Sequence, residues 1–171
     1  VSLAEAGDYI AGYTVANDYG LHDFRDTDSG SMLRVKGADT LCPLGPGLIT
    51  DWDFHGKRIR TLVNGQVKQD GSTDEMAWDM HYLVADIART ITLLPGDVLL
   101  SGTPANSRTV YLGDVVEVEV EGHQGDRRHH RPEHLRRGPT VGVELEDQRP
   151  TVGDDAVAGP VEAVCVGLEA V

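Results

Sequence analysis

Cysteine is scarce in this sequence of 171 residues, and long apolar runs are missing. Its two cysteines, Cys42 and Cys165, stand far apart and outside any C-x-x-C spacing, which excludes a disulfide framework and a thiolate zinc site. Such cysteine usage favours a reducing, cytoplasmic location. A membrane-spanning helix needs roughly 20 consecutive apolar residues, so we expect no association with a membrane.

Basic residues are also in short supply. The sequence has 15 Lys and Arg residues against 28 Asp and Glu residues, which gives a net charge of −13. This charge would repel the phosphates of nucleic acids and the surfaces of anionic membranes. We therefore expect no nucleic-acid partner. The hydrophobic content of 40% is sufficient for the core of one globular domain.

The middle of the chain has two clear secondary-structure signals. Residues 59–69 are β-prone on both sides of an Asn-Gly pair, which favours the positive φ angles of a tight hairpin turn. Ser72 and Glu75 have the spacing of a capping box and precede apolar residues at helical intervals. The sequence therefore predicts a β-hairpin followed by a helix over residues 73–91.

Three further segments predict strands, at residues 9–16, 98–100 and 115–121. The last of these alternates valine with glutamate, so its valines would face the core and its glutamates the other side. Glu117 and Glu119 could chelate a metal from one strand face. We interpret them instead as residues of a solvent-exposed face.

Residues 17–37 are polar, rich in Asp and Gly, and without clear periodicity, which predicts a long loop. Long loops inside compact domains are usually functional. Asp18, His22 and Lys36 bring an oxygen ligand, an imidazole and a cation to this loop, and Thr40 follows it. Oxygen donors favour Mg²⁺, Ca²⁺ or Mn²⁺, and a lysine can stabilise a carboxylate or a developing enolate. The same residue types are also common as solvated turn formers.

The composition changes after residue 122. Residues 125–138 contain five arginines and three histidines, and the last 49 residues contain no Lys, Ile, Phe, Asn, Met, Ser, Tyr or Trp. The arginine-rich segment cannot build a core. We predict that residues 123–171 form an atypical tail, either disordered or translated out of frame. Its Arg and His content would alternatively suit binding of nucleic acid or metal.

Seven short motifs follow one another in the first 122 residues. They are GYTVAND at residues 12–18, LRVK at 33–36, CPLGP at 42–46, VNG at 63–65, LPGD at 94–97, SGTP at 101–104 and GDVVEVEVEG at 113–122. Their order and spacing resemble the catalytic domain of the fumarylacetoacetate hydrolase superfamily. Asn-Asp-Tyr at residues 17–19 and the LRVK motif resemble in particular the bacterial isomerase/decarboxylases of homoprotocatechuate breakdown. Those enzymes act on 2-hydroxyhepta-2,4-diene-1,7-dioate and 5-oxopent-3-ene-1,2,5-tricarboxylate.

The resemblance implies an α+β fold that is mainly β with few helices, arranged as a mixed β-roll. Residues 1–122 would be a partial catalytic domain, truncated at its N-terminus. The family's Glu-x-Glu metal ligands and its general base lie upstream of the first motif, and this sequence begins after them. The resemblance also implies a homodimer.

The resemblance assigns roles to five residues. Asp18 matches a ligand of Mg²⁺ or Mn²⁺, Lys36 matches a catalytic and substrate-binding lysine, and Thr40 and Thr103 match substrate-binding threonines. His22 is a further substrate-binding candidate. It stands where the family commonly has an arginine, so this cationic contact would either be lost or become pH-dependent. Simpler interpretations remain open: Asp18 and Thr103 as turn residues, and Lys36 and His22 as solvated loop residues.

The implied function is that of a metal-dependent enzyme for small 2-oxo or 2-hydroxy dienoic acids in the catabolism of aromatic compounds. It would act as an isomerase or decarboxylase on a 2-oxo acid whose enolate the metal stabilises as a Lewis acid. One alternative is a C–C hydrolase of the acylpyruvate or fumarylacetoacetate type. The other is a non-catalytic, truncated remnant of this fold.

Overall fold

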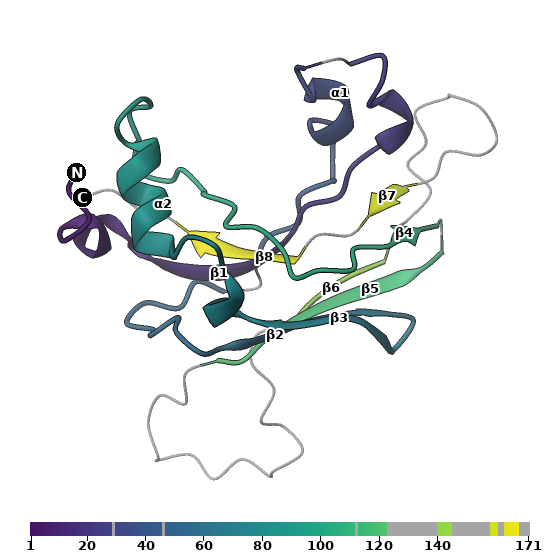
Figure 1. Ribbon diagram of the computed structural model, residues 1–171. Coiled ribbons are helices and arrows are strands. Elements are labelled where there is room, and N and C mark those ends of the chain that lie inside the picture. The colour runs from purple at the N-terminus through teal and green to yellow at the C-terminus, as the bar shows by residue number, and fades with distance from the viewer. Residues whose placement is uncertain are drawn as a thin grey trace, which may run out of the picture.

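The computed structural model describes residues 1–28, 30–45, 47–111 and 113–122, together with the backbone of residues 140–144, 158–160 and 163–167. Over these residues, antiparallel strands form one four-stranded sheet and two two-stranded sheets, accompanied by short helices (Figure 1). This confirms the predicted α+β class, mainly β with few helices. No helix in this part of the chain has both the length and the apolar character needed to cross a bilayer.

The four-stranded sheet is built around the predicted hairpin. In spatial order it consists of β3 (Gln66–Ser72), β2 (Arg58–Val63), β5 (Val115–Val120) and β6 (Thr140–Glu144). Asn64 and Gly65 join β2 to β3 with φ angles of 51° and 74°, as a tight hairpin turn requires. The predicted hairpin and the predicted strand over residues 115–121 are therefore confirmed.

The core is formed by side chains that alternate between the two faces of β2 and β5. Cross-strand pairs place Ile59 opposite Val120, Thr61 opposite Val118, and Val63 opposite Val116. All six side chains are buried. Because side chains alternate between the faces of a strand, this shared face packs inward, and β2 and β5 form the centre of the sheet.

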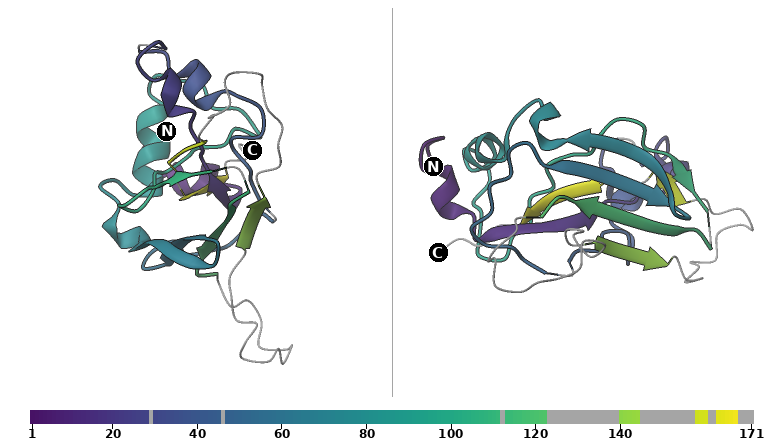
Figure 2. Two further views of the ribbon diagram at one scale, coloured as in Figure 1. Left: turned by 90° about the vertical axis from the view of Figure 1, so that its right-hand side faces the viewer. Right: turned by 90° about the horizontal axis from the view of Figure 1, so that it is seen from below.

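Strand β1 (Gly12–Asn17) is buried along its whole length. It pairs antiparallel with β8 (Ala163–Gly167), and the two strands lie side by side in Figures 1 and 2. On its other side, Tyr13 exchanges backbone hydrogen bonds of 2.9 and 2.8 Å with Ile49. The ring of Tyr13 packs 5.2 Å from that of Trp52. The predicted strand over residues 9–16 is thus present, beginning three residues later.

The predicted helix over residues 73–91 is shorter than expected. It begins as a short 3₁₀ turn, η3 (Thr73–Glu75), after which Met76 is extended, and α2 covers only Met80–Ile87. The cap of α2 is Asp79, whose carboxylate accepts a 2.7 Å hydrogen bond from the Tyr82 N–H. The segment thus has two N-caps, Ser72 for η3 and Asp79 for α2. The spacing of the apolar residues did not predict that the backbone becomes extended between them.

The predicted strand at residues 98–100 is also wrong. These residues form no strand, and only Leu99 is buried, while Val98 and Leu100 are 42% and 38% exposed. The next strand is the short β4 (Thr109–Val110), which pairs with β7 (Ala158–Pro160). A run of three apolar residues does not distinguish a strand from an extended loop that buries one side chain.

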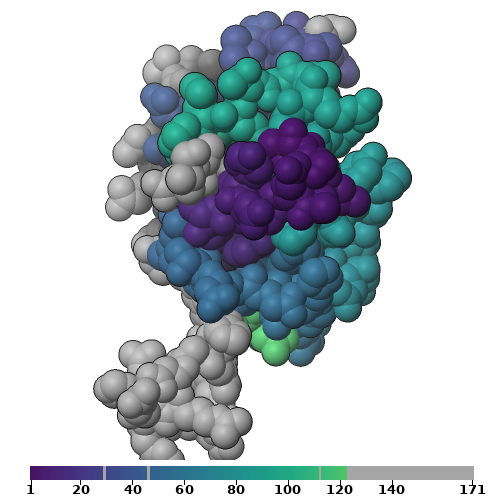
Figure 3. All heavy atoms as spheres, turned by 90° about the vertical axis from the view of Figure 1, so that its left-hand side faces the viewer, coloured from purple at the N-terminus to yellow at the C-terminus, as the bar shows by residue number. Residues whose placement is uncertain are grey.

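The N-terminal turn η1 (Ala6–Tyr9) packs against α2 through Ala6, which is fully buried. In the space-filling view, these N-terminal residues lie between segments from the middle of the chain (Figure 3). Strands β6, β7 and β8 all come from the predicted tail and pair with β5, β4 and β1. The arginine-rich residues 125–138 lie outside the described residues, and the boundary at residue 122 stays a prediction.

Candidate active site

The candidate site starts where β1 ends. Asp18 is the first residue after this buried strand, and its side chain is 18% exposed. The backbone N–H groups of Asn17 and Tyr19, on either side, donate hydrogen bonds of 3.1 and 2.8 Å to the carbonyls of Pro43 and Leu41. The segment that follows the strand is therefore fixed, and the Asp18 carboxylate has a defined position.

Lys36 meets Asp18 directly. Its ammonium nitrogen lies 2.9 Å from Asp18 Oδ2 and donates a second hydrogen bond of 3.3 Å to the Asp18 carbonyl. Lys36 is the last residue of α1 (Leu33–Lys36), a short helix within the predicted loop. This helix is anchored by Val35, which is fully buried and accepts a 2.8 Å hydrogen bond from the Leu21 N–H.

His22 lies beside the same lysine. It opens η2 (His22–Phe24), a 3₁₀ turn in the predicted loop. A Cβ atom on Gly20 would lie 2.9 Å from the His22 ring and 3.5 Å from Lys36 Cε. The absence of a side chain at Gly20 therefore lets both residues pack over one stretch of backbone. The structure therefore places His22 and Lys36 near Gly20, and Lys36 bonds to Asp18. The substrate-binding role of His22 stays a prediction.

Thr40 has an unusual backbone conformation. Its φ angle is 69°, and the residue is exposed between α1 and the segment that pairs with Tyr19. A β-branched residue in the left-handed region is an outlier and indicates local strain. Such strain is frequent at binding sites. The substrate-binding role of Thr40 stays a prediction.

Sequence patterns did not indicate the residues that lie around Asp18 and Lys36. Burial raises the pKa of the Cys42 thiol; the charge of Asp18 raises it further, and that of Lys36 opposes the shift. Burial also raises the pKa of Tyr19, so its phenol stays neutral.

Two buried polar residues flank Asp18. Asn17 is 1% exposed and Tyr19 is fully buried. Neither the amide of Asn17 nor the hydroxyl of Tyr19 has a hydrogen-bond partner among the described residues. Because an unsatisfied buried polar group costs about 1–3 kcal/mol, both groups are candidates to bind water or a ligand at this end of β1.

The described residues do not complete a metal site. They contain no group of three His, Cys, Asp or Glu side chains that could hold an ion. Asp18 offers one carboxylate, and its Oδ2 is bound to Lys36. Glu119 is 6% exposed and forms an ion pair with Arg60, so the predicted solvent-exposed glutamate face is wrong at this residue.

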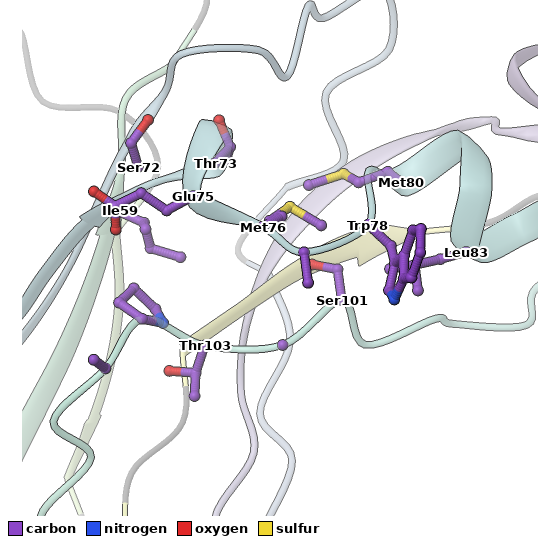
Figure 4. A pocket seen from close by; sticks show the side chains of 14 residues that line it. Ile59, Ser72, Thr73, Glu75, Met76, Trp78, Met80, Leu83, Ser101 and Thr103 are labelled. Carbon is purple, nitrogen blue, oxygen red and sulfur yellow. The ribbon is translucent and has the colours of Figure 1, made fainter.

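Thr103 lies in a part of the molecule that is separate from the contact between Asp18 and Lys36. It lines a cavity of about 360 Å³ between the end of β3, the start of α2 and residues 101–105 (Figure 4). Met76 and Met80 line one side of this cavity, and Ser101 and Thr103 line the other. Neither Asp18 nor Lys36 is among the residues that line it.

Comparison with known proteins places these features in a family. The family model described as "Fumarylacetoacetate (FAA) hydrolase C-terminal" matches residues 1–129. A curated relative, the "4-hydroxyphenylacetate degradation bifunctional isomerase/decarboxylase" of Escherichia coli, is 41% identical over 125 residues. The match covers 71% of this chain and 29% of the relative.

Two solved structures are similar in sequence and in fold. The 5-carboxymethyl-2-hydroxymuconate delta-isomerase from Mycobacterium smegmatis is 44% identical with a TM-score of 0.68, over 71% of this chain and 48% of that one. The 2-hydroxyhepta-2,4-diene-1,7-dioate isomerase from Mycobacterium marinum is 44% identical with a TM-score of 0.67, over 70% and 47%. The chain spans about half or less of the length of the curated relatives it matches.

Proposed function

Because this chain belongs to the fumarylacetoacetate hydrolase family, we propose that it acts in an enzyme that isomerises or decarboxylates small 2-oxo or 2-hydroxy dienoic acids. The pathway would be the catabolism of aromatic compounds. The names of similar proteins support this assignment, since they include isomerases and isomerase/decarboxylases. The observation that carries it is the contact of Lys36 with Asp18 at the end of β1.

The chemistry requires a cation near the reacting oxygen. Shifting a double bond next to a 2-oxo group, or removing its carboxylate, passes through an enolate with negative charge on oxygen. A preorganised ammonium group in a partly buried site stabilises such charge. Lys36 is suited to this role because Asp18 fixes its position and its side chain is 28% exposed. Thr40, Thr103 and His22 are proposed as further contacts to the substrate.

We also propose that the enzyme depends on a divalent metal, Mg²⁺ or Mn²⁺. Asp18 would supply one oxygen ligand, the donor type that both ions prefer. The other ligands are not among the described residues, which hold no group of three suitable side chains. The role assigned to Lys36 does not require that the metal site be complete within this chain.

The test uses the full chain that the gene encodes. It is incubated with 2-hydroxyhepta-2,4-diene-1,7-dioate and with 5-oxopent-3-ene-1,2,5-tricarboxylate, in Mg²⁺ and after treatment with EDTA, and the products are identified by NMR. We expect Mg²⁺-dependent conversion of at least one compound. No conversion of either, together with no binding of oxalate in the presence of Mg²⁺, would contradict the proposal. Light scattering on the same sample tests the proposed homodimer.

Hydrolysis of a C–C bond is the second candidate, because the matching family model is named for a hydrolase. The two reactions give different products. A hydrolase consumes water and releases two smaller acids, whereas an isomerase conserves the molecular formula and a decarboxylase releases CO₂. Product analysis with an acylpyruvate as an additional substrate therefore separates them.

A further inference from the structure

The loop of residues 22–34 is held together with little help from the apolar core. Among its described residues, 22–28 and 30–34, no apolar side chain is buried. Its ends meet at the hydrogen bond from the Leu21 N–H to the Val35 carbonyl, and α1 lies apart from the four-stranded sheet (Figure 1). Fixing such a compact loop costs conformational entropy that little buried apolar surface offsets. Polar contacts must therefore hold it.

Asp28 is the centre of these polar contacts. Its side chain is only 9% exposed. Oδ2 accepts a 2.6 Å hydrogen bond from the Arg34 N–H, and Oδ1 accepts a 3.0 Å hydrogen bond from the Ser31 hydroxyl. The Asp28 N–H donates a 2.8 Å hydrogen bond to the carbonyl of Phe24, the last residue of η2. Asp28 therefore links η2 to α1.

The same contacts replace the N-cap that α1 lacks. Met32 stands at the cap position with a φ angle of 56° and makes no side-chain cap hydrogen bond. The first N–H groups of a helix have no partner within it. Here the Leu33 N–H donates a 3.2 Å hydrogen bond to Ser31 Oγ, whose hydroxyl is bound to Asp28. A helix of four residues is not stable alone, so the start of α1 depends on the Asp28 carboxylate.

The side chain of Arg34 adds a second contact across the loop. Its Nε lies 3.6 Å from Asp28 Oδ1, and its guanidinium carbon lies 5.5 Å from the centre of the Phe24 ring. Burial raises the pKa of Asp28, but the hydrogen bonds from the Arg34 N–H and the Ser31 hydroxyl outweigh burial, so this pKa is lowered. The carboxylate is therefore ionised at neutral pH and remains an acceptor.

The position of Lys36 depends on this arrangement, because Lys36 is the last residue of α1. Burial of Val35 fixes one side chain of the helix and leaves its start without an anchor. We propose that Asp28 is a positioning residue for Lys36: it holds α1 where the ammonium group reaches Asp18 and the substrate. The inference rests on the proposed function, in which Lys36 stabilises an enolate. It predicts that Asp28 affects the reaction only through Lys36.

A double-mutant cycle tests this coupling. kcat/KM is measured with Mg²⁺ for the full chain encoded by the gene. The substrate is 2-hydroxyhepta-2,4-diene-1,7-dioate, or 5-oxopent-3-ene-1,2,5-tricarboxylate if only that compound is converted. We expect Asp28→Ala alone to lower kcat/KM about tenfold, because a misplaced charge keeps only part of its effect. In the Lys36→Met background, the same change should lower kcat/KM by less than about twofold.

A role of Asp28 in the fold alone gives a different result. A variant that only reduces the fraction of folded protein loses the same factor in both backgrounds. An equal loss of about tenfold beside Lys36→Met would therefore overturn the inference, as would wild-type kcat/KM of Asp28→Ala. Asp26→Ala, which changes an exposed carboxylate of the same loop, is the matched control and should keep the wild-type kcat/KM.

Asp28→Asn keeps one carbonyl oxygen as an acceptor and loses the other, so its loss should be smaller, about threefold. If Asp28→Ala does not fold, Asp28→Asn takes its place in the cycle, and either unchanged kcat/KM or losses that add to those of Lys36→Met overturn the inference. A wild-type chain that converts neither compound, or Lys36→Met with wild-type kcat/KM, overturns the proposed function of Lys36 and this inference with it. Impaired Lys36→Met together with unimpaired Asp28→Ala overturns this inference alone, which distinguishes the two failures.

Discussion

Lys36 is held by two oxygens of one residue, at 2.9 Å from the Asp18 carboxylate and 3.3 Å from the Asp18 carbonyl. Such a contact limits where the ammonium group can move. A charge fixed before the reaction stabilises the transition state without the cost of reorganising the site. Lys36 is therefore the residue at which the proposed function is most directly tested by substitution.

We expect Lys36→Met to lower kcat/KM by about 100-fold or more, the usual effect of removing a preorganised charge. Methionine keeps the length of the side chain and removes only the ammonium group. The matched control is Lys68→Met, because Lys68 is an exposed lysine of β3 that bonds to Gln66. Steady-state kinetics on both variants make the comparison. Equal activity of the two variants would show that Lys36 is a structural residue.

The contact between Asp18 and Lys36 could be predicted only in part. Their residue types and shared loop indicate a site, but their separation of 18 positions in the sequence hides the pairing. That pairing depends on the backbone hydrogen bond from Leu21 to Val35 and on the four-residue helix α1. A helix this short leaves no periodic pattern of apolar residues in the sequence. The hydrogen bonds of Gln69 to Thr103 and Pro104 could not be predicted either, because these partners lie 34 and 35 positions away in the sequence.

At the scale of elements, local chemistry decides which predictions are confirmed. The hairpin of β2 and β3 was predictable because two adjacent residues, Asn64 and Gly65, specify its turn. The helix after it was not, because Ser72 and Asp79 both act as caps: Ser72 Oγ accepts from Asp74 N–H, and Asp79 accepts from Tyr82 N–H. The apolar residues between them satisfy the helical spacing without forming one helix.

The position of the helix start can be measured. We expect Asp79→Ala to lower the free energy of unfolding by about 1 kcal/mol, because it removes the N-cap of α2. The control is Asp86→Ala on the exposed face of the same helix. Urea unfolding monitored by circular dichroism gives both values. A larger loss for Ser72→Ala than for Asp79→Ala would contradict the observed helix start.

The ion pair between β2 and β5 gives a second prediction at this scale. Arg60 is 31% exposed, and its partner Glu119 is 8% exposed at the side chain. Arg60→Met would leave a buried carboxylate without this cation, and we expect a loss of about 2 kcal/mol in unfolding free energy after allowing for the partial exposure of Arg60. Arg58→Met breaks the exposed pair with Asp70 and should have a smaller effect. Similar losses in guanidinium unfolding would contradict the burial of Glu119.

At the scale of the whole molecule, several carboxylates bind protons with a different affinity in the folded and the unfolded chain. The Arg58 guanidinium lowers the pKa of Asp70. A hydrogen bond from the His55 N–H lowers the pKa of Asp53, and one from the Ser2 hydroxyl lowers the pKa of Glu5. Each group holds its proton less tightly in the folded chain than in the unfolded one. The net charge of −13 acts in the opposite sense, since protonation relieves repulsion.

The lowered pKa values of these carboxylates change the stability of the fold in a defined range of pH. Groups with a lowered pKa stabilise the fold above the ordinary carboxyl pKa of about 4, and this contribution is lost as the pH falls through their lower folded values. We therefore expect the unfolding free energy to fall steeply below about pH 4. Asp70→Asn cannot titrate at this position, so its loss of stability on acidification should be shallower than that of the wild type. Urea unfolding of both proteins between about pH 3 and pH 6 makes the measurement, and parallel curves would show that the ion pair of Asp70 with Arg58 does not persist in solution.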